Sequence, residues 1–111
     1  MKIAFATDGN DLNYEIASHF GRAKNFLIYD TEKKNFKVFE NPELKGKELP
    51  PDFLYNQGVK VVIAFALGPR AFEKFKNYKI EVYKAIEGTI LENLRELEKG
   101  RLRKLRKEDI F

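Results

Sequence analysis

Short apolar runs separated by polar turns predict five β-strands along this chain. The strands are expected near residues 2–7, 25–30, 35–40, 60–65 and 80–84. The fourth run is the strongest, because Val61, Val62 and Ile63 are β-branched and favour extended backbone. The first run is apolar at nearly every position without clean alternation, which is typical of a central strand buried on both faces. The polar connection between the second and third runs predicts an antiparallel hairpin.

Helix signals stand between and after the later strands. A short helix is expected at residues 52–56. Gly68 followed by Pro69 predicts the start of a second helix, because proline is favoured at the first helical position. Thr89 and Glu92 have the spacing of a capping box, and the amphipathic pattern that follows them predicts a third helix.

The order of these elements is a hairpin-containing β-rich half followed by two βα units. Strands joined by right-handed helical crossovers run parallel to one another. The sequence therefore predicts an α/β fold with three layers, in which a five-stranded mixed sheet contains one antiparallel strand. The fourth strand is expected inside the sheet rather than at its edge.

Length and charge divide the chain into a body and a short end segment. The 111 residues suit one domain, expected over residues 1–100. The net charge is +4, and residues 101–111 hold five basic and two acidic side chains, so the body is close to neutral. We expect this C-terminal segment (residues 101–111) to add little to the core, and its removal to cost little stability. Its basic character alone does not predict a nucleic-acid-binding face.

Other features of the composition limit the classes of site and location. The chain has no cysteine, which excludes disulfides, thiolate catalysis and thiolate metal ligands. No apolar run reaches the roughly 18 residues of a membrane helix, and the first residues become polar too early for a signal peptide. We therefore expect a cytoplasmic protein without a membrane partner. The abundance of Lys and Glu favours a thermophilic source.

The candidate chemistry centres on the chain's single histidine. His19 is followed by Phe20, Gly21 and Arg22. Neutral imidazole is a common metal ligand, Gly21 can adopt positive φ or admit a ligand close to the backbone, and arginine offers a fork of donors to an anion. The alternative is a solvated histidine with no ligand.

Three loops are expected at the carboxyl ends of the parallel strands, where α/β sheets bind ligands. They bring Asp8, Gly68 with Pro69, and Glu87 with Gly88 toward His19. Two of the loops begin helices, whose unpaired N–H groups attract anions. Each also has a plain structural explanation as a turn or a helix start.

Five short motifs in this order resemble the dinitrogenase iron–molybdenum cofactor biosynthesis domain family. They are Met1-Lys2-Ile3-Ala4, Ser18-His19-Phe20-Gly21-Arg22, Glu40-Asn41-Pro42, Gly68-Pro69-Arg70-Ala71-Phe72 and Glu87-Gly88-Thr89. The resemblance spans roughly residues 1–100. It implies a ribonuclease-H-like fold and a carrier or insertion protein, not an enzyme, that binds an iron–sulfur or iron–molybdenum cluster or its precursor. It also implies that His19 contacts the cluster, and that a cluster-donating or cluster-accepting protein is a partner.

The chain departs from the family pattern before the fourth strand. Many relatives carry a His-Gly-x-Gly-like segment there, whereas residues 44–51 of this chain contain no histidine. One side of the site is therefore expected to be altered.

Two other functions remain open at the level of sequence. A ribonuclease-H-like sheet can host a metal-dependent nuclease, which needs several carboxylates around divalent ions, and only Asp8 is suitably placed. The basic C-terminal segment could instead serve as an interaction module, for which salt-sensitive RNA binding is the expected sign.

Overall fold

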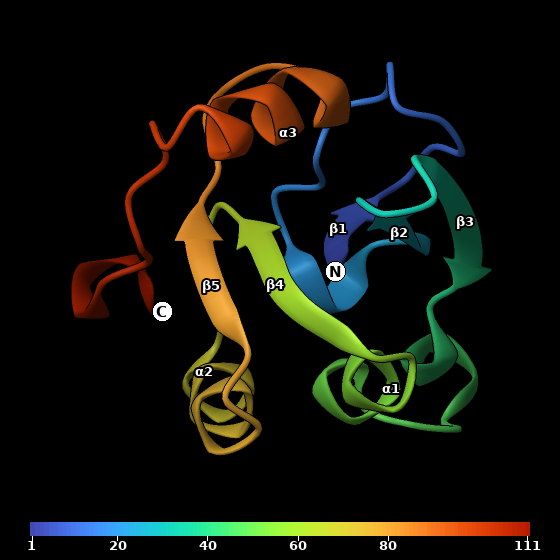
Figure 1. Cartoon of the computed structure of the whole chain (residues 1–111). Coiled ribbons are helices and arrows are strands. Elements are labelled where there is room, and N and C mark those ends of the chain that lie inside the picture. The colour runs from blue at the N-terminus through green and yellow to red at the C-terminus, as the bar shows by residue number, and fades with distance from the viewer.

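A computed structural model describes residues 1–111 and shows a five-stranded sheet in the order β3-β2-β1-β4-β5 (Figure 1). The prediction of five strands is confirmed, with bounds within one residue of those expected. The strands are β1 (Lys2–Thr7), β2 (Asn25–Asp30), β3 (Asn35–Glu40), β4 (Val59–Ala64) and β5 (Glu81–Lys84).

The sheet is mixed, as predicted. β1 pairs with β4 and β4 with β5 in parallel, while β2 is antiparallel to both of its neighbours. Thus β2 is the one antiparallel strand, and the β2–β3 hairpin turns at Lys34 with φ of 55°. β4 lies between β1 and β5, so the prediction that it is internal is confirmed.

Helices cover both faces of the sheet. α1 (Pro50–Asn56) and α2 (Pro69–Asn77) lie together on one face, and α3 (Ile90–Glu98) covers the other (Figure 1). This arrangement confirms the three layers, while the name ribonuclease-H-like stays a prediction. None of the helices is both long and apolar enough to cross a membrane.

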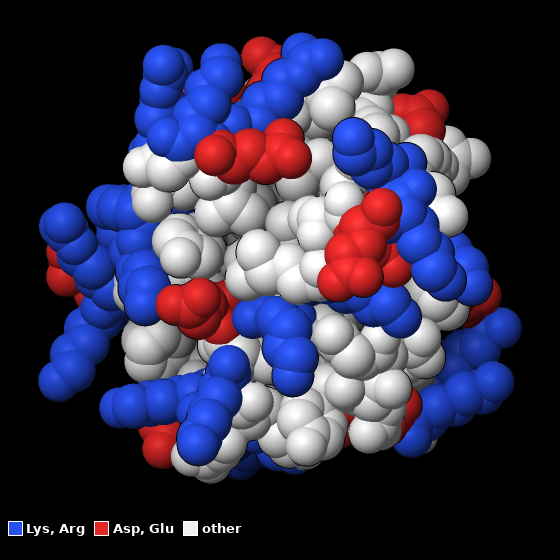
Figure 2. Space-filling model, viewed as in Figure 1, with Lys and Arg blue, Asp and Glu red and all other residues white.

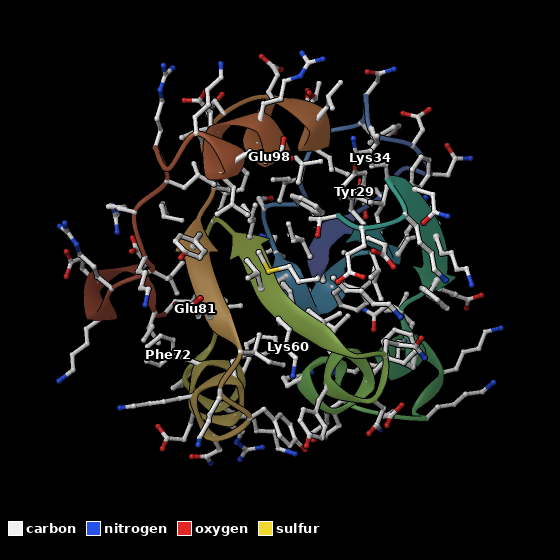
Figure 3. All side chains as sticks on the ribbon, viewed as in Figure 1. Tyr29, Lys34, Lys60, Phe72, Glu81 and Glu98 are labelled. Carbon is white, nitrogen blue, oxygen red and sulfur yellow. The ribbon has the colours of Figure 1, made fainter.

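Alternation along the strands divides the core into two clusters. Ala4 and Ala6 of β1 face α1 and α2, whereas Ile3 and Phe5 face α3, because successive side chains of a strand point to opposite faces. Figure 3 shows side chains filling the space between the sheet and the helices, while charged side chains extend outward around the perimeter. Both faces of β1 are buried, as its uninterrupted apolar pattern predicts.

The capping box at the start of α3 leads to a stability prediction. The Thr89 hydroxyl accepts a hydrogen bond from the Glu92 N–H, and the Glu92 carboxylate accepts one from the Thr89 N–H. Thr89→Ala is expected to lower the free energy of unfolding by about 1 kcal/mol, since it removes the N-cap acceptor. Thr89→Ser keeps the hydroxyl and should remain close to wild type. Chemical denaturation measures both, and an unaffected Thr89→Ala variant would show that the cap is dispensable.

The C-terminal segment packs against the body of the protein, which makes our expectation that it adds little to the core wrong. After Gly100, with φ of 71°, residues 101–106 are extended rather than helical, and a single 3₁₀ turn follows at Lys107–Asp109. It runs beside β5, where the Lys84 N–H donates to the Arg103 carbonyl and the Leu105 N–H to the Val82 carbonyl. This pairing covers backbone groups at the edge of the sheet.

Two leucines of the segment enter the core. Leu102 is 8% exposed and packs with the α3-side cluster, and Leu105 is 7% exposed and packs with the other. In an extended chain, residues three apart point to opposite faces. The sequence suggested a dispensable segment because five of its residues are basic and few are large and apolar, whereas the extended path lets both leucines reach the core.

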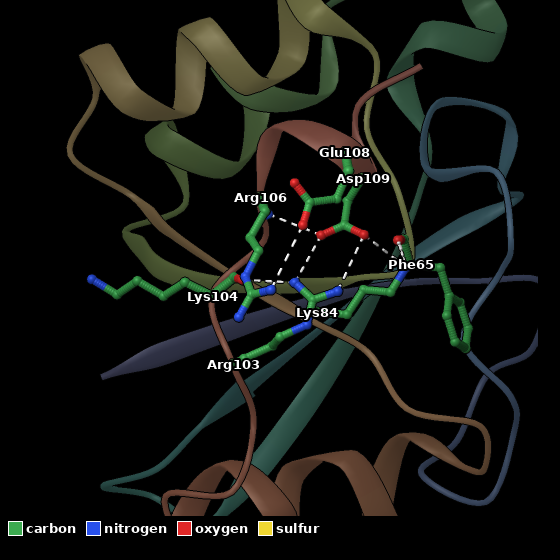
Figure 4. Close-up of polar contacts among 7 residues, drawn as sticks. All are labelled: Phe65, Lys84, Arg103, Lys104, Arg106, Glu108 and Asp109. Atoms are coloured by element: carbon green, nitrogen blue, oxygen red, sulfur yellow. Dashed lines mark hydrogen bonds and ion pairs between the residues drawn. The ribbon is translucent and has the colours of Figure 1, made fainter.

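A cluster of ionic contacts around Asp109 fastens the end of the segment (Figure 4). Its carboxylate accepts hydrogen bonds from the Arg103 guanidinium at 2.9 and 3.3 Å and from the Arg106 N–H at 2.9 Å. The Lys84 ammonium lies 3.5 Å away and also donates to the Phe65 carbonyl. These donors, the Arg103 guanidinium first, hold the pKa of Asp109 well below its usual range.

This lowered pKa predicts how stability depends on pH. A carboxyl whose folded-state pKa is depressed stabilises the fold above its unfolded-state pKa of about 3.9 and loses that contribution as pH falls toward the folded-state value. Asp109→Asn should therefore lower the melting temperature by a few degrees at pH 7, with the difference from wild type shrinking below about pH 4. Glu108→Gln is the matched control, because Glu108 forms an ion pair only with Arg106 and both side chains are exposed. A difference that persists unchanged in acid would contradict this assignment.

Candidate functional site

A groove of about 700 Å³ opens beside His19, at the side of the sheet that carries α1 and α2. We call it the His19 groove. It is formed by three segments: the turn after residue 18, the loop that leads into α1, and the start of α2, with Phe111 beside them. Its lining consists of His19, Phe20, Gly21, Arg22, Glu43, Leu49, Pro50, Pro51, Gly68, Arg70, Ala71, Glu73, Lys74 and Phe111.

The turn that carries His19 is anchored by its aromatic neighbour. Phe20 is buried, with its ring centroid 5.2 Å from that of Phe26 and 5.7 Å from that of Phe75. Just before this turn, the Ala17 N–H donates a hydrogen bond to the Ala6 carbonyl near the end of β1. His19 is thereby exposed while its backbone is fixed, as a ligand-contacting side chain requires.

A buried asparagine ties this turn to the next wall of the groove. Asn41 is fully buried, and its side-chain amide donates to the carbonyls of Gly21 at 3.2 Å and Ala23 at 2.9 Å. Its amide oxygen accepts from the Glu43 N–H at 3.0 Å. Both polar atoms of this side chain are hydrogen-bonded to backbone groups, so Asn41 positions the walls of the groove rather than contacting a ligand.

The start of α2 presents free backbone donors to the groove. Pro69 has no N–H, and the N–H groups of Arg70 and Ala71 have no acceptor in the protein. The Gly68 carbonyl accepts the first helical hydrogen bond, from the Phe72 N–H, and the carbonyl of Leu67, just before the helix, accepts from the Phe111 N–H. Unpaired N–H groups at a helix start, together with the helix dipole, favour anionic ligands.

The charged side chains of the groove are of both signs. Arg22, Arg70, Glu43 and Glu73 take part in none of the ion pairs of the structure. Lys74 differs, because its ammonium lies 2.8 Å from the Asp52 carboxylate. Asp52 raises the pKa of Lys74, and the hydrogen bond from Lys74 lowers the pKa of Asp52. Two arginines and two glutamates therefore remain available to a ligand.

The second predicted helix start does not reach the groove. α3 lies on the opposite face of the sheet, and its first N–H groups, of Ile90 and Leu91, donate to the carbonyls of Tyr14 and Leu12. Glu87 and Gly88 accordingly do not line the His19 groove, which corrects our expectation that they face it. The loop of residues 10–15 that occupies this helix start has no strong pattern of its own, so the sequence did not reveal it.

Asp8 and Pro69 are also outside the lining, against expectation. The Asp8 carboxylate accepts from the Lys24 N–H at 3.0 Å and so joins the end of β1 to the start of β2. Pro69 begins α2, as predicted, and acts by leaving the helix start open. Gly21 and Gly68 line the groove but neither has positive φ, so of the two properties considered for Gly21, only the close approach of a ligand to its backbone stays a prediction. A Cβ at Gly21 would lie 3.7 Å from the Glu43 carboxylate, so its lack of a side chain leaves room beside that acid.

Sequence reasoning thus placed His19, Gly21, Arg22 and Gly68 together and missed much of the opposite wall. The segment that lacks the family's histidine supplies Leu49, Pro50 and Pro51 to the groove. Arg70 stood inside a motif that the resemblance used, but its side chain was given no role. Glu43, Glu73 and Phe111 carried no local signal, because only the folded chain brings them to His19.

The donor set suits a ligand that brings most of its own coordination. No three His, Asp or Glu side chains are arranged to hold a metal ion together. His19 can give one nitrogen, the carboxylates of Glu43 and Glu73 can give oxygen, and the arginines and free N–H groups can bind anionic atoms. A bare metal ion would be held weakly here, whereas a preformed metal–sulfur anion has partners for both its metal and its sulfur.

Comparison with known proteins identifies relatives along nearly the whole chain. A family model described as dinitrogenase iron-molybdenum cofactor matches residues 1–100. Among curated proteins, an uncharacterized protein of Methanocaldococcus jannaschii is 34% identical over 111 residues, covering 94% of this chain and 91% of that protein.

Solved structures share the fold at nearly full coverage. A Thermotoga protein presented as a candidate NifB protein of the DUF35 family has a TM-score of 0.79 at 31% identity, covering 96% of this chain and 97% of that one. A protein presented as a candidate dinitrogenase of Methanocaldococcus jannaschii has a TM-score of 0.74 at 27% identity, covering 95% and 94%. The apo form of the orange protein from Desulfovibrio gigas has a TM-score of 0.85 at 20% identity, covering 94% and 92%, a likeness of fold alone.

Proposed function

Because this chain belongs to the dinitrogenase iron-molybdenum cofactor family, we propose that it is a small carrier of a metal–sulfur cluster. Its cargo is an iron–sulfur or iron–molybdenum cluster, or a precursor of one, bound in the His19 groove. The cluster is cargo rather than a resident cofactor. The protein receives it from one protein and delivers it to another, and performs no catalysis itself.

The observation that carries the proposal is the meeting of His19 with the open start of α2. An exposed imidazole and two unpaired backbone N–H groups line one groove with Arg22 and Arg70. Imidazole bonds to metal, and N–H groups and guanidinium bond to sulfide or oxo atoms. In the absence of thiolates, one protein–metal bond supported by charge and hydrogen bonds gives reversible binding, which suits a protein that must release its cargo.

The carboxylates of the groove support a metal-containing ligand over a simple anion. Glu43 and Glu73 would repel any anion, a metal–sulfur anion included, because like charges repel one another in a partly enclosed site, so the arginines and the free N–H groups must outweigh them. A cluster also presents electropositive metal, for which a carboxylate oxygen is a suitable neighbour. The groove carries charges of both signs and therefore favours a ligand that presents both anionic sulfur atoms and electropositive metal.

The alternative of an RNA-binding C-terminal segment receives little support from the charges. Arg101, Arg103, Lys104 and Arg106 each form an ion pair with an acidic side chain. Figure 2 shows Asp and Glu among the Lys and Arg side chains on this face, without one unbroken basic surface. For a nuclease, Asp8 is the candidate acid, and its carboxylate is engaged by the Lys24 N–H. No observation favours either alternative.

Anaerobic reconstitution of the purified protein with iron, sulfide and molybdate tests the proposal. After desalting, we expect metal and sulfide to remain bound in a constant ratio, with visible absorbance from sulfur-to-metal charge transfer. Bovine serum albumin treated identically controls for adsorbed metal sulfide. Wild-type protein that retains no more metal than this control would contradict the carrier function.

A further inference from the structure

Phe111 is an aromatic side chain without an evident role in stability. It is 71% exposed, the highest value among the large apolar side chains of the chain. Its ring nevertheless lies over the start of α2, since a Cβ at Gly68 would be 3.9 Å from the Phe111 Cε2 atom. Phe111 also lines the His19 groove. An exposed apolar ring at the rim of an open groove buries more of its surface when the groove is filled.

The backbone around Phe111 is held in place from two directions. The Phe111 N–H donates to the Leu67 carbonyl at 3.1 Å, and the Leu67 N–H donates to the Asp109 carbonyl at 3.3 Å. Between them, Ile110 packs against the core cluster beneath α1 and α2. The ionic contacts of Asp109 then join this stretch to Lys84 and Arg103 (Figure 4). The ring is thus exposed, but its attachment is fixed.

This contribution to the groove comes from outside the part of the chain that the family model matches. The family model matches residues 1–100. Residues 103–111, the last part of the C-terminal segment and here called the strap, add Phe111 as a wall to the groove that the matched residues form. Leu49, 47% exposed, is the other large apolar side chain of the lining that faces solvent. It stands in the segment where this chain lacks the histidine of many relatives. Apolar bulk is therefore present at two places on the rim.

We propose that Phe111 contacts the bound cargo and slows its release, and that the strap is the element that positions this ring. The inference rests on the proposed carrier function and deepens it. His19 supplies the bond to metal, while Phe111 shields the bound cluster from water on one side. Displacing water from the rim strengthens the hydrogen bonds and charge interactions within the groove, because the local dielectric falls.

Release of a defined metal–sulfur anion tests this role. Tetrathiomolybdate is bound to wild type, Phe111→Ala, Phe111→Leu and Leu44→Ala, and its dissociation after rapid dilution is followed by absorbance. Leu44 is the matched control, since it is a large apolar side chain, 53% exposed, that does not line the groove. We expect Phe111→Ala to release the anion about tenfold faster with little change in association, as is usual when a contact residue is truncated. Phe111→Leu should recover much of the slow release, and Leu44→Ala should match wild type.

The outcomes separate this inference from the carrier function. Wild type that binds the anion and a Phe111→Ala variant that releases it at the wild-type rate would overturn the role of Phe111 alone. Wild type that binds neither tetrathiomolybdate nor the cluster reconstituted from iron, sulfide and molybdate would overturn both. If Leu44→Ala releases the anion as fast as Phe111→Ala, the effect comes from general loss of apolar surface, and the role of Phe111 is also overturned. Because the ring is mostly exposed, the melting temperature of Phe111→Ala should stay close to wild type, which excludes unfolding as the cause.

Discussion

Replacing His19 with alanine is expected to remove most of the protein's ability to retain a metal–sulfur cargo. His19 is the only imidazole in the chain, and no cysteine can replace it as a ligand. Loss of an outer-shell partner of a metal site costs roughly 10–100-fold in affinity, and loss of the ligand itself should cost at least that much. Metal content after anaerobic reconstitution and desalting measures the effect.

Two further variants show whether the effect belongs to the imidazole. Arg22→Ala should weaken retention by about tenfold, because it removes a charge-assisted hydrogen bond but no metal bond. Ser18→Ala is the matched control, since Ser18 is exposed and adjacent but does not line the groove. His19→Ala should keep the wild-type circular dichroism and melting temperature, as the side chain is exposed. Full retention of metal by His19→Ala would show that the imidazole is not a ligand.

Removal of residues 101–111 is expected to destabilise the protein severely. The deletion exposes the apolar surface that Leu102 and Leu105 cover and uncovers the edge of β5. Burial of two leucines is worth about 3–6 kcal/mol in all, which for a domain of this size corresponds to a fall in melting temperature of at least about 10 °C. Thermal denaturation followed by circular dichroism measures the change.

Single substitutions in the full-length chain keep this prediction testable when the shortened chain does not fold. Leu105→Ala should cost about 2–4 kcal/mol, because it leaves a cavity in the cluster beneath α1 and α2. Lys107→Ala is the control, since Lys107 is exposed and forms no ion pair. If the melting temperature falls by only a degree or two for both the deletion and Leu105→Ala, the segment contributes little to stability, as its sequence first suggested.

The strands were predictable because their signals are local. The runs of β-branched and apolar residues at Ile3 and Val62, and the capping pair Thr89 and Glu92, carry the information within a few positions. The extended course of residues 101–106 was not predictable in this way. Leucines three apart fit either a helix or a strand that crosses the edge of a sheet, and only the open edge of β5 decides between them.

The candidate site likewise contains residues that the sequence predicts and residues that only the folded chain brings together. His19, Arg22 and Gly68 follow β1 and β4, and the topological rule for parallel strands brings them together correctly. The same rule failed for Glu87 and Gly88, because it does not specify which face of the sheet a helix start occupies or whether another loop takes its N–H groups. Residues such as Glu43 and Phe111 depend on the tertiary path of long connections, about which the local sequence says little.

Mapping the binding site of a metal–sulfur anion is the most direct test of the central claim. Isotope-labelled wild-type protein is titrated anaerobically with tetrathiomolybdate, a diamagnetic anion, while its amide and imidazole resonances are recorded. We expect saturable shifts at the His19 imidazole and at the backbone amides of Phe20, Gly21, Arg70 and Ala71. Shifts that are absent, or that gather instead around the distant lysines Lys2, Lys33 and Lys37 near the β2–β3 hairpin, would contradict the assignment of the His19 groove as the cargo site.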